Sequence, residues 1–515
     1  MNALRDRLLA AAGRYPDRTA LWVAGHRYTY RELFARAAAV AGRLDRREEP
    51  FCLVYCGKNL TRYVAILASL LAGKAFVPLC PTSPPAYCEK VLKQLDGQIV
   101  AIVDSGDPAG DDRLCALMAP PVPLLDHGPG GAQPEPGFGG GEHPPRRTGP
   151  QWTGEPAHPQ DGAYLMFTSG STGVPKAVLV TQDNLLAYLD GATVLFAPSC
   201  VDRFAQVNNA TFDLSVHDIV LPWTVGAAVY ALPDQAVYKL PALVREHALT
   251  FWLSVPTTGV SLLDLGLLTP GSLPSLRRTL FCGEPLPRRL AAAWQAANPE
   301  GELFNVYGPT ECTIAVTAFA WRPDQDLPDI VPIGAPYPGQ RVRVVGPDLA
   351  EVPDGETGEL LLQGAQLVPG YYGNPAQTAT RFVEVPGAEG RWYRTGDLVA
   401  CDTGWGLVFK GRRDDQLQVR GHRVERLEVE TLLRQVLGTE SVAVVGWPVV
   451  DGSLVQGLVA FVADTGLPVP ELRRRISQEL PEHLWPSQIH VGPLPQNRSL
   501  KVDYPALRRR LDGAP

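Results

Sequence analysis

Lysine is scarce in this chain of 515 residues, and methionine and histidine are also few. The 47 basic residues comprise 8 lysines and 39 arginines, alongside 3 methionines and 9 histidines. Each lysine therefore departs from a strong preference for arginine, and we ask of each whether its position suggests a function.

Long apolar runs and paired metal-ligand motifs are also missing. No stretch approaches the roughly 20 apolar residues that cross a bilayer, and the amphipathic start (1–16) has no signal-peptide core. The nine cysteines are scattered without a CxxC motif, and no His/Cys cluster has metal-ligand spacing. These absences predict a reduced cytoplasmic protein without membrane attachment, with Cys52 and Cys56 as buried thiols. The net charge of −7 argues against a nucleic-acid partner.

Length and pattern predict several α/β units, because 515 residues exceed what one core accommodates. Residues 1 to about 105 alternate helical patterns with short apolar runs, which is typical of an α/β layered domain. Strands are expected at 21–24, 51–55 and 75–79, and a helix over 63–72. From about 106 to 162 glycine and proline are abundant and apolar residues few, which predicts a flexible surface insertion.

The stretch 164–180, YLMFTSGSTGVPKAVLV, reads as a strand, a polar loop and a second strand. Hydroxyls and glycines leave backbone N–H groups accessible to a polyphosphate, and Lys176 adds a positive charge. A hairpin loop of small residues is the alternative, but the lysine and the flanking strands favour phosphate binding. The loop is not a P-loop of the GxxxxGK[ST] type, because Ala177 follows Lys176 and no helix start is evident.

Further along, several polar residues have types that suit nucleotide binding. In NVYGPTE (305–311), Tyr307 can stack on a purine, Asn305 can bond its edge and Glu311 can hold a divalent cation, although the segment could also be only a turn. Asp397 follows a glycine turn and suits ribose hydroxyls, with an Asx-turn as the alternative. Arg412 can reach ribose or phosphate, or be solvated.

Two charged residues complete the set. Asp213 precedes an apolar helical pattern, where an aspartate is usually a helix cap. Lys501 is the single lysine among 13 arginines between residues 412 and 515, and it is either a surface lysine or a catalytic one.

Together these motifs resemble those of acyl-adenylate-forming enzymes. The loop matches TSGSTGxPK, residues 212–218 match FDxSxxD, and 70–85 resembles LxAGxxxVPxxP. The motifs most resemble those of stand-alone amino-acid adenylation enzymes of the nonribosomal peptide type, especially D-alanine and L-proline carrier-protein ligases. At the family's C-terminal NGKxD loop this chain reads NRSLKVD, with Leu500 in place of glycine.

The resemblance implies a mixed α/β fold: a large N-terminal adenylation core (1–413) with β subdomains, and a small mobile α+β C-terminal lid (414–515) that rotates about Asp414. It implies that ATP and Mg²⁺ activate an amino acid as its adenylate. Glu311 would hold the metal, Lys501 would be catalytic, and Gly421 would let a pantetheine arm pass. The residues expected to bind ATP are Thr168, Ser169, Gly170, Ser171, Thr172, Gly173, Lys176, Gly283, Glu284, Asn305, Tyr307, Gly308, Thr310, Asp397 and Arg412.

The family's substrate pocket, transferred to this sequence, is mainly aliphatic. Asp213 would hold the ammonium group and Lys501 the carboxylate, while His217 is expected to fill space. The pocket positions are Asp213, Leu214, His217, Leu253, Leu280, Cys282, Val306, Ile314 and Ala315. This lining favours a small apolar amino acid, D-alanine first, with L-proline as an alternative and an acyl- or aryl-CoA ligase as a second one. No carrier domain is apparent in the sequence, so a phosphopantetheinylated carrier protein is expected in trans.

Overall fold

The computed structural model describes residues 3–115, 161–168, 175–413, 416–450, 454–463, 465–496 and 502–513. Most of the predicted insertion (116–160), the loop residues 169–174, Asp414 and residues 497–501, with Lys501, lie outside the described residues, so those predictions stay predictions. Among the helices of the described ranges, none combines the length and the apolar character that crossing a bilayer requires.

A nine-stranded sheet forms the centre of the N-terminal part, in the order β14-β13-β12-β11-β10-β8-β9-β1-β2. Its strands are β1 (Thr19–Val23), β2 (His26–Thr29), β8 (Arg203–Gln206), β9 (Ala228–Ala231), β10 (Phe251–Ser254), β11 (Arg278–Phe281), β12 (Glu302–Tyr307), β13 (Thr317–Ala320) and β14 (Ala335–Pro336). The strands β8, β10, β11 and β12 are parallel neighbours. Their carboxyl ends therefore meet at one edge, where open α/β sheets bind ligands.

Helices pack against this sheet and connect its strands. They are α1 (Ala3–Arg14), α2 (Tyr30–Leu44), α7 (Leu214–Val225), α8 (Leu240–His247), α9 (Pro256–Asp264) and α10 (Arg288–Ala297), with the short 3₁₀ helices η2 (Asp234–Lys239) and η3 (Thr310–Cys312). The helix α7 is mainly apolar and is buried from Leu214 to Thr224, as expected for a helix enclosed by protein.

A second sheet has the order β5-β3-β4-β6-β7 and carries the predicted phosphate loop. Its elements are β3 (Phe51–Cys56), β4 (Ala75–Pro78), β5 (Ile99–Asp104), β6 (Gly162–Thr168) and β7 (Lys176–Thr181), with α3 (Leu60–Leu71), α4 (Pro85–Gln94), α5 (Pro108–Cys115) and α6 (Gln182–Phe196). The hairpin predicted over 164–180 is present, with Thr168 opposite Lys176 at its open end. The helix α5 lies inside the region predicted as a flexible insertion, because Pro108 begins a short helix that buries Leu114.

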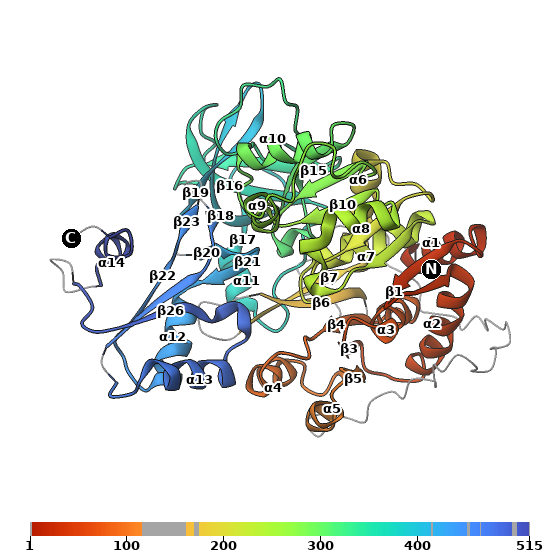
Figure 1. Ribbon diagram of the computed structural model, residues 1–515, viewed down its shortest axis with the longest axis horizontal. Helices are drawn as coiled ribbons and strands as arrows, with labels where there is room; N and C mark the ends of the chain where they lie inside the picture. Colours follow the sequence, from red (N-terminus) through yellow and green to blue (C-terminus); the bar gives the residue numbers. More distant parts are fainter. Residues whose placement is uncertain are drawn as a thin grey trace.

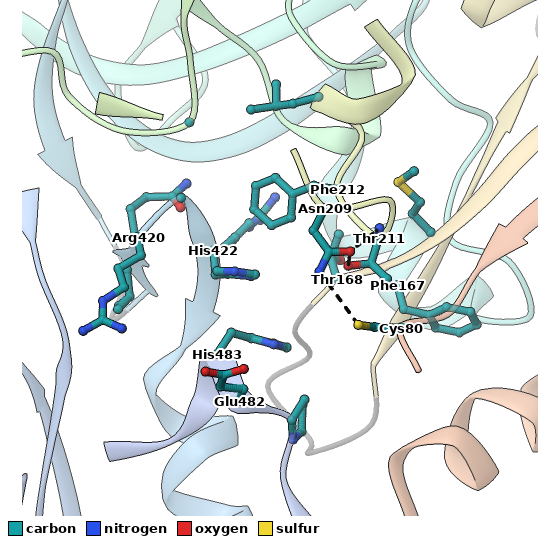
Figure 2. A pocket seen from close by; sticks show the side chains of 18 of the residues that line it. Cys80, Phe167, Thr168, Asn209, Thr211, Phe212, Arg420, His422, Glu482 and His483 are labelled. Carbon is teal, nitrogen blue, oxygen red and sulfur yellow. Dashed lines mark hydrogen bonds between the residues drawn. The ribbon is translucent and has the colours of Figure 1, made fainter. Parts of the chain in front are cut away.

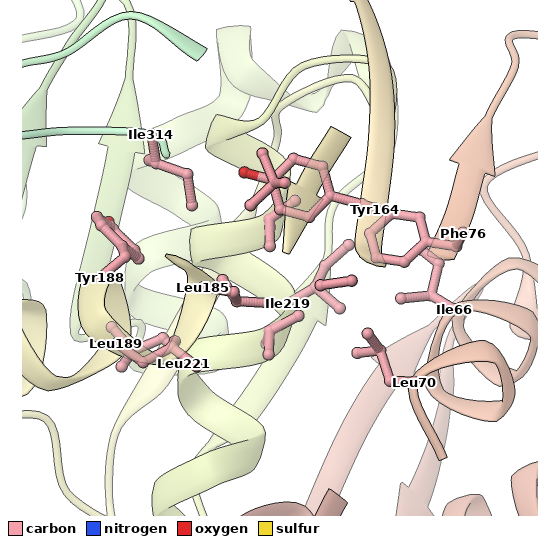
Figure 3. Close-up of a cluster of buried hydrophobic side chains, with 14 of the residues drawn as sticks. Ile66, Leu70, Phe76, Tyr164, Leu185, Tyr188, Leu189, Ile219, Leu221 and Ile314 are labelled. Carbon is pink, nitrogen blue, oxygen red and sulfur yellow. The ribbon is translucent and has the colours of Figure 1, made fainter. Parts of the chain in front are cut away.

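The main apolar core lies between these two sheets. Figure 3 shows side chains of α3, α6 and α7 meeting around Tyr164 of β6, whose ring lies 5.7 Å from that of Phe76. Tyr164 and Phe76 are almost fully buried. This packing fixes the hairpin and α7 relative to each other, and with them the polar residues at their ends.

A third sheet follows, with β15-β16-β18-β17 in order and β19 beside β18. It comprises β15 (Gln340–Val345), β16 (Thr357–Gly364), β17 (Phe382–Glu384), β18 (Arg391–Asp402) and β19 (Gly406–Arg412), with α11 (Pro375–Arg381). Asp397 and Arg412 are paired residues on β18 and β19, so this sheet brings two of the predicted nucleotide-binding residues together.

The C-terminal part forms two small sheets, β21-β20-β24-β23 and β22-β25-β26, and in the described ranges their strands pair only with one another. The elements are β20 (Gln416–Val419), β21 (His422–Glu425), α12 (Arg426–Leu437), β22 (Val442–Gly446), β23 (Val449–Val450), β24 (Leu454–Val455), β25 (Leu458–Val462), α13 (Val469–Glu479), η4 (Glu482–Leu484), β26 (Pro486–Val491) and α14 (Tyr504–Leu511). In Figure 1 this blue part lies against the N-terminal core, with α13 beside α4. The strand pairing fits the predicted boundary at 414, which stays a prediction.

One C-terminal residue is buried among N-terminal ones. Leu454 of β24 is 1% exposed and belongs to an apolar cluster with Trp252 of β10 and Leu286. The C-terminal part therefore contributes apolar as well as polar contacts to the interface.

Candidate active site

A cavity of about 550 Å³ lies between the N-terminal core and the C-terminal part. Figure 2 shows Phe212 and Thr168 on one side of it, with Arg420, His422 and His483 on the other. Nine residues predicted from the sequence line this one cavity: Thr168, Asp213, Leu214, Cys282, Gly283, Gly308, Thr310, Ile314 and, from the C-terminal part, Gly421. The first eight come from the hairpin, from the start of α7 and from the carboxyl ends of β11 and β12.

Asp213 occupies the N-cap position of α7, but its side chain does not cap the helix. Its backbone is already helical, and its side chain makes no capping hydrogen bond. The carboxylate is 9% exposed, and its Oδ2 atom is buried without a hydrogen-bond partner. Burial raises the pKa of Asp213 to about 7, against a smaller lowering effect of the Thr310 hydroxyl. A buried carboxylate with an unused oxygen in a cavity is suited to a cationic ligand.

The predicted substrate pocket divides into two layers. Leu214, Cys282 and Ile314 line the cavity around Asp213. The remaining positions are buried in the core, and among the described residues they do not line this cavity: His217, Leu253, Leu280, Val306 and Ala315. The space beside Asp213 is therefore closed by three medium-sized side chains.

His217 is held by a residue that the sequence did not single out. The Tyr188 hydroxyl lies 2.7 Å from His217 Nδ1, and both side chains are buried. Tyr188 stacks on Tyr337 at 6.2 Å, while the rings of Phe196 and Phe204 lie near the imidazole. Burial lowers the pKa of His217 to about 3, so the ring is neutral. His217 therefore lies in the core beside the cavity rather than in its lining, and its space-filling role stays a prediction.

Three predicted nucleotide residues meet next to the cavity. The Tyr307 hydroxyl donates to Asp397 Oδ2 at 2.5 Å, and the Arg412 guanidinium donates to Asp397 Oδ1 and to the Thr395 carbonyl. Asp397 is 7% exposed, and its pair with Arg412 satisfies its charge. An aromatic ring, a carboxylate and a guanidinium at one place suit a nucleoside, and their individual roles stay predictions.

Two other predicted ATP residues have partners inside the protein. Asn305 donates both amide N–H groups to the carbonyls of Val331 and Pro332, at 2.9 Å each. Glu284 accepts hydrogen bonds from the Thr257 amide and hydroxyl and from the Gly421 amide. Asn305 thus stabilises the carboxyl end of β12, and Glu284 connects the N-terminal core to the C-terminal part.

Glu311 and Lys176, expected to hold a metal and phosphates, are both buried and both paired with C-terminal residues. Arg423 Nη1 lies 3.0 Å from Glu311 Oε2, and Lys176 Nζ lies 3.1 Å from Glu425 Oε1. Burial opposes ionisation of Glu311, but Arg423 and the Tyr371 hydroxyl bring its pKa down to about 2. Burial and the Arg423 charge lower the pKa of Lys176.

The spacing of Arg423 and Glu425 in the sequence is the one local signal for these partners. Arg423 and Glu425 flank Val424 in a strand, and alternate residues of a strand face the same side. Arg423 belongs to an arginine-rich run, in which solvated side chains are the ordinary expectation. Its burial depends on Glu311, 112 positions earlier, so local pattern alone does not reveal it.

An aromatic cluster lines the C-terminal side of the cavity. The rings of His422 and His483 stack at 4.6 Å, and Phe212 meets His422 edge-on at 4.7 Å. Burial lowers the pKa of His422 to about 4, and that of His483 is also well below its usual range. Both rings are therefore neutral near pH 7 and form an uncharged wall.

Comparison with known proteins identifies the family. The chain matches the family model of the AMP-binding enzymes over residues 8–372. It is 33% identical over 525 positions to an L-proline–[L-prolyl-carrier protein] ligase of Pseudomonas fluorescens, with all of both chains covered. A D-alanine–D-alanyl carrier protein ligase of Lactiplantibacillus plantarum is 30% identical over 442 positions, covering 82% of this chain and 80% of the relative. Several other relatives are longer, and the chain spans 19% to 44% of their length.

Comparison with solved structures leads to the same family. The Vibrio cholerae adenylation domain AlmE, in complex with glycyl-adenosine-5′-phosphate, matches with a TM-score of 0.83 and 31% identity, over 100% of this chain and 98% of that one. This chain belongs to the AMP-binding enzyme family, and its fold is that of an adenylation domain with a C-terminal subdomain. The family resemblance and the mixed α/β fold expected from the motifs are thereby confirmed, and ATP is the nucleotide that the family uses.

Proposed function

We propose that this protein activates a small apolar α-amino acid, D-alanine first, as its adenylate and passes it to the phosphopantetheine thiol of a separate carrier protein. The observation that carries the proposal is the Asp213 carboxylate, which lines the cavity and whose buried Oδ2 has no hydrogen-bond partner. An α-ammonium group would complete it by a charge-assisted hydrogen bond. An acid without an amine would leave the carboxylate uncompensated, which disfavours the acyl- or aryl-CoA ligase alternative.

The size of the substrate is inferred from Leu214, Cys282 and Ile314, which close the space beside Asp213. The relatives named for L-proline and D-alanine, and the neighbour holding a glycyl adenylate, also point to small amino acids. L-Proline remains the alternative, because the relative named for it aligns over the whole chain. Such substrates differ by only one or a few methylenes, each worth roughly 1–3 kcal/mol of discrimination.

In the first half-reaction, a substrate carboxylate oxygen attacks the α-phosphorus of ATP, and pyrophosphate leaves. The substrate carboxylate is already ionised at neutral pH, so no base is required. Asp213 orients the amino acid through its ammonium group, and Lys176 offers a positive charge to the phosphates. The Glu311 carboxylate is a hard oxygen donor suited to Mg²⁺, which when bound would neutralise phosphate charge. Lys501 remains the predicted ligand of the substrate carboxylate.

In the second half-reaction, the carrier thiol attacks the carbonyl carbon of the adenylate. A thioester forms, AMP leaves, and the thiol proton is released. Gly421, His422 and His483 line the same cavity as Asp213, and we assign the pantetheine arm to this side of it. Coenzyme A is the alternative acceptor.

ATP–pyrophosphate exchange tests the proposal with D- and L-alanine, glycine, proline, serine, valine and β-alanine. We expect exchange with one small α-amino acid and its loss, by about 100-fold or more, in Asp213→Asn, since a neutral amide cannot pair with the ammonium. Exchange with acids that lack an amine, unaffected by Asp213→Asn, would instead place the protein among the CoA ligases.

A further inference from the structure

We propose that Tyr371 is a positioning residue of the adenylation site: its hydroxyl orients the Glu311 carboxylate toward a metal ion, and its ring supports the Lys176 ammonium for phosphate. The sequence shows Tyr371 only as the first of two adjacent tyrosines. The inference rests on the proposed function in one respect, because that proposal gives Glu311 to Mg²⁺ and Lys176 to the phosphates of ATP.

The segment 368–372, which lies between β16 and α11, connects the two predicted ligand-binding positions through its backbone. The Val368 amide donates to the Glu311 carbonyl at 2.9 Å. The Tyr372 amide donates to the Ala177 carbonyl at 2.8 Å, directly after the predicted phosphate lysine in the sequence. The segment is therefore fixed to the metal position at one end and to β7 at the other.

The Tyr371 hydroxyl holds one oxygen of the Glu311 carboxylate. It donates to Oε1 at 2.6 Å, and the two residues are 5% and 0% exposed. A hydrogen bond to a charged carboxylate is one of the stronger kinds, and here no water competes for it. The other oxygen, Oε2, is the one nearer to a cation, Arg423 Nη1, at 3.0 Å. The hydroxyl thus sets the direction in which the carboxylate faces positive charge, as groups that support a metal ligand do.

The ring of the same residue lies against Lys176. The Nζ atom is 5.9 Å from the centroid of the Tyr371 ring, within the range of cation–π attraction, and the lysine side chain is 3% exposed. A buried ammonium needs compensation for its lost hydration. An aromatic face supplies part of it without adding an anionic group that would repel a phosphate.

Tyr371 is itself held firmly enough to position other groups. Its amide donates to Thr378 Oγ1 of α11 at 2.9 Å, and its backbone forms a β-bridge with Val178 of β7. Its ring meets that of Phe382 edge-on at 5.6 Å. A side chain whose rotamer is fixed by packing and backbone contacts can fix its hydrogen-bond partner in turn.

Calorimetric binding of ATP to the full chain, without an amino acid, separates the two contacts when it is measured with Mg²⁺ and with EDTA. Tyr371→Phe loses the hydroxyl and keeps the ring, so we expect the Kd of MgATP to rise about tenfold and that of metal-free ATP to stay unchanged. Tyr371→Leu loses both contacts, so metal-free ATP should also bind about threefold more weakly.

The neighbouring tyrosine provides the matched control. The Tyr372 hydroxyl lies 3.5 Å from Gln98 Oε1, on another part of the chain. Tyr372→Phe therefore removes the same atom from the adjacent position and should leave both Kd values unchanged. Thermal unfolding of the three variants shows whether each is folded at the temperature of the binding measurement.

The metal requirement of the reaction gives a second readout. The Mg²⁺ concentration for half-maximal ATP–pyrophosphate exchange should be about tenfold higher in Tyr371→Phe than in the unsubstituted chain. A residue that only stabilised the fold would lower the unfolding temperature without changing this requirement.

Three outcomes decide between the inference and the proposed function. Equal losses of ATP affinity with and without Mg²⁺ in Tyr371→Phe would overturn the inference. If Glu311→Gln weakens MgATP binding and Tyr371→Phe does not, the inference falls and the metal role of Glu311 stands; if neither does, both fall. If the exchange panel reveals no amino-acid substrate while the Kd values differ as expected, the proposed substrate class falls and the role of Tyr371 stands.

Discussion

Gly421, at the turn between β20 and β21, approaches Val255 so closely that a β-carbon at position 421 would lie 2.3 Å from Val255 Cγ1. Its φ of +80° is also a conformation that L side chains rarely adopt. Val255 belongs to the N-terminal core, so this contact spans the interface that encloses the cavity. Position 421 therefore accepts only glycine in the arrangement described above.

The first prediction concerns this contact. Gly421→Ala should leave ATP–pyrophosphate exchange measurable but lower aminoacyl transfer to the carrier by about tenfold or more, because the close approach to Val255 is lost. Both half-reactions are measured separately on one preparation. Gly438→Ala is the matched control: its φ is +68°, but a β-carbon there meets nothing within 4 Å. Equal losses in the two variants would show that backbone strain alone is responsible.

The second prediction concerns the pH dependence of amino-acid binding. Burial raises the pKa of Asp213 to about 7 in the ligand-free protein, and only its ionised form pairs with an ammonium group. Amino-acid affinity should therefore rise as pH increases from 6 to 8, by about tenfold at most. The KM for the amino acid, determined by exchange across this range, gives the measurement. In Asp213→Asn the residual KM should lose this slope.

The third prediction concerns folding stability, which the raised pKa of Asp213 also affects. An aspartate whose pKa is raised in the folded state stabilises the protein fully below its unfolded value near 4, and this contribution is lost by about pH 7. Relative to Asp213→Asn, the ligand-free protein should lose up to about 4 kcal/mol of unfolding free energy between pH 4 and 7. Urea unfolding of both proteins at pH 5 and pH 8 measures the difference. A difference independent of pH would contradict the assigned pKa.

The fourth prediction concerns the closed end of the cavity. Ile314 lines the cavity beside Asp213, so Ile314→Ala should admit larger apolar amino acids such as valine or leucine. The preference for the larger over the natural substrate should change by roughly 10- to 200-fold, the usual effect of one or two methylenes. Relative kcat/KM values measure it. Ile219→Ala is the control, since this buried α7 residue belongs to the same apolar core but does not line the cavity.

The fifth prediction concerns the nucleotide side. Arg412→Gln removes the cation paired with Asp397 and should raise the KM for ATP by about 10-fold or more, with a smaller effect on the amino-acid KM. The neighbouring Arg413→Gln is the control, because Arg413 pairs with Glu359 and its side chain is 51% exposed. Equal effects of both substitutions would argue against a nucleotide role for Arg412.

The sequence predicted those parts of the fold and site that depend on local pattern. The 164–180 hairpin, the strands at 21–24, 51–55 and 75–79, and the helix that follows Asp213 all follow from apolar runs broken by polar and glycine residues. Even there the pattern did not decide whether Asp213 is a helix cap or a residue that binds a ligand. In the structure Asp213 occupies the N-cap position of α7 but its side chain makes no capping hydrogen bond, and its role as a ligand-binding residue stays a prediction.

What could not be predicted depends on contacts between distant segments. Glu425 meets Lys176 across 249 positions, and Gly421 meets Glu284 across 137. A short window of sequence does not reveal either partner, because each pairing depends on how the C-terminal part packs against the N-terminal core. The Tyr188–His217 contact is also tertiary: the two residues lie on different buried helices, whose crossing no periodicity specifies.

Because Leu454 is buried among N-terminal residues, the stability of the interface should depend on temperature. Any movement that separates the C-terminal part from the core would bring this side chain and the surface around Trp252 into water. Exposure of apolar surface increases heat capacity, and the hydrophobic contribution weakens on cooling. The balance between joined and separated arrangements should therefore shift with temperature, and a smaller side chain at position 454 would reduce that dependence.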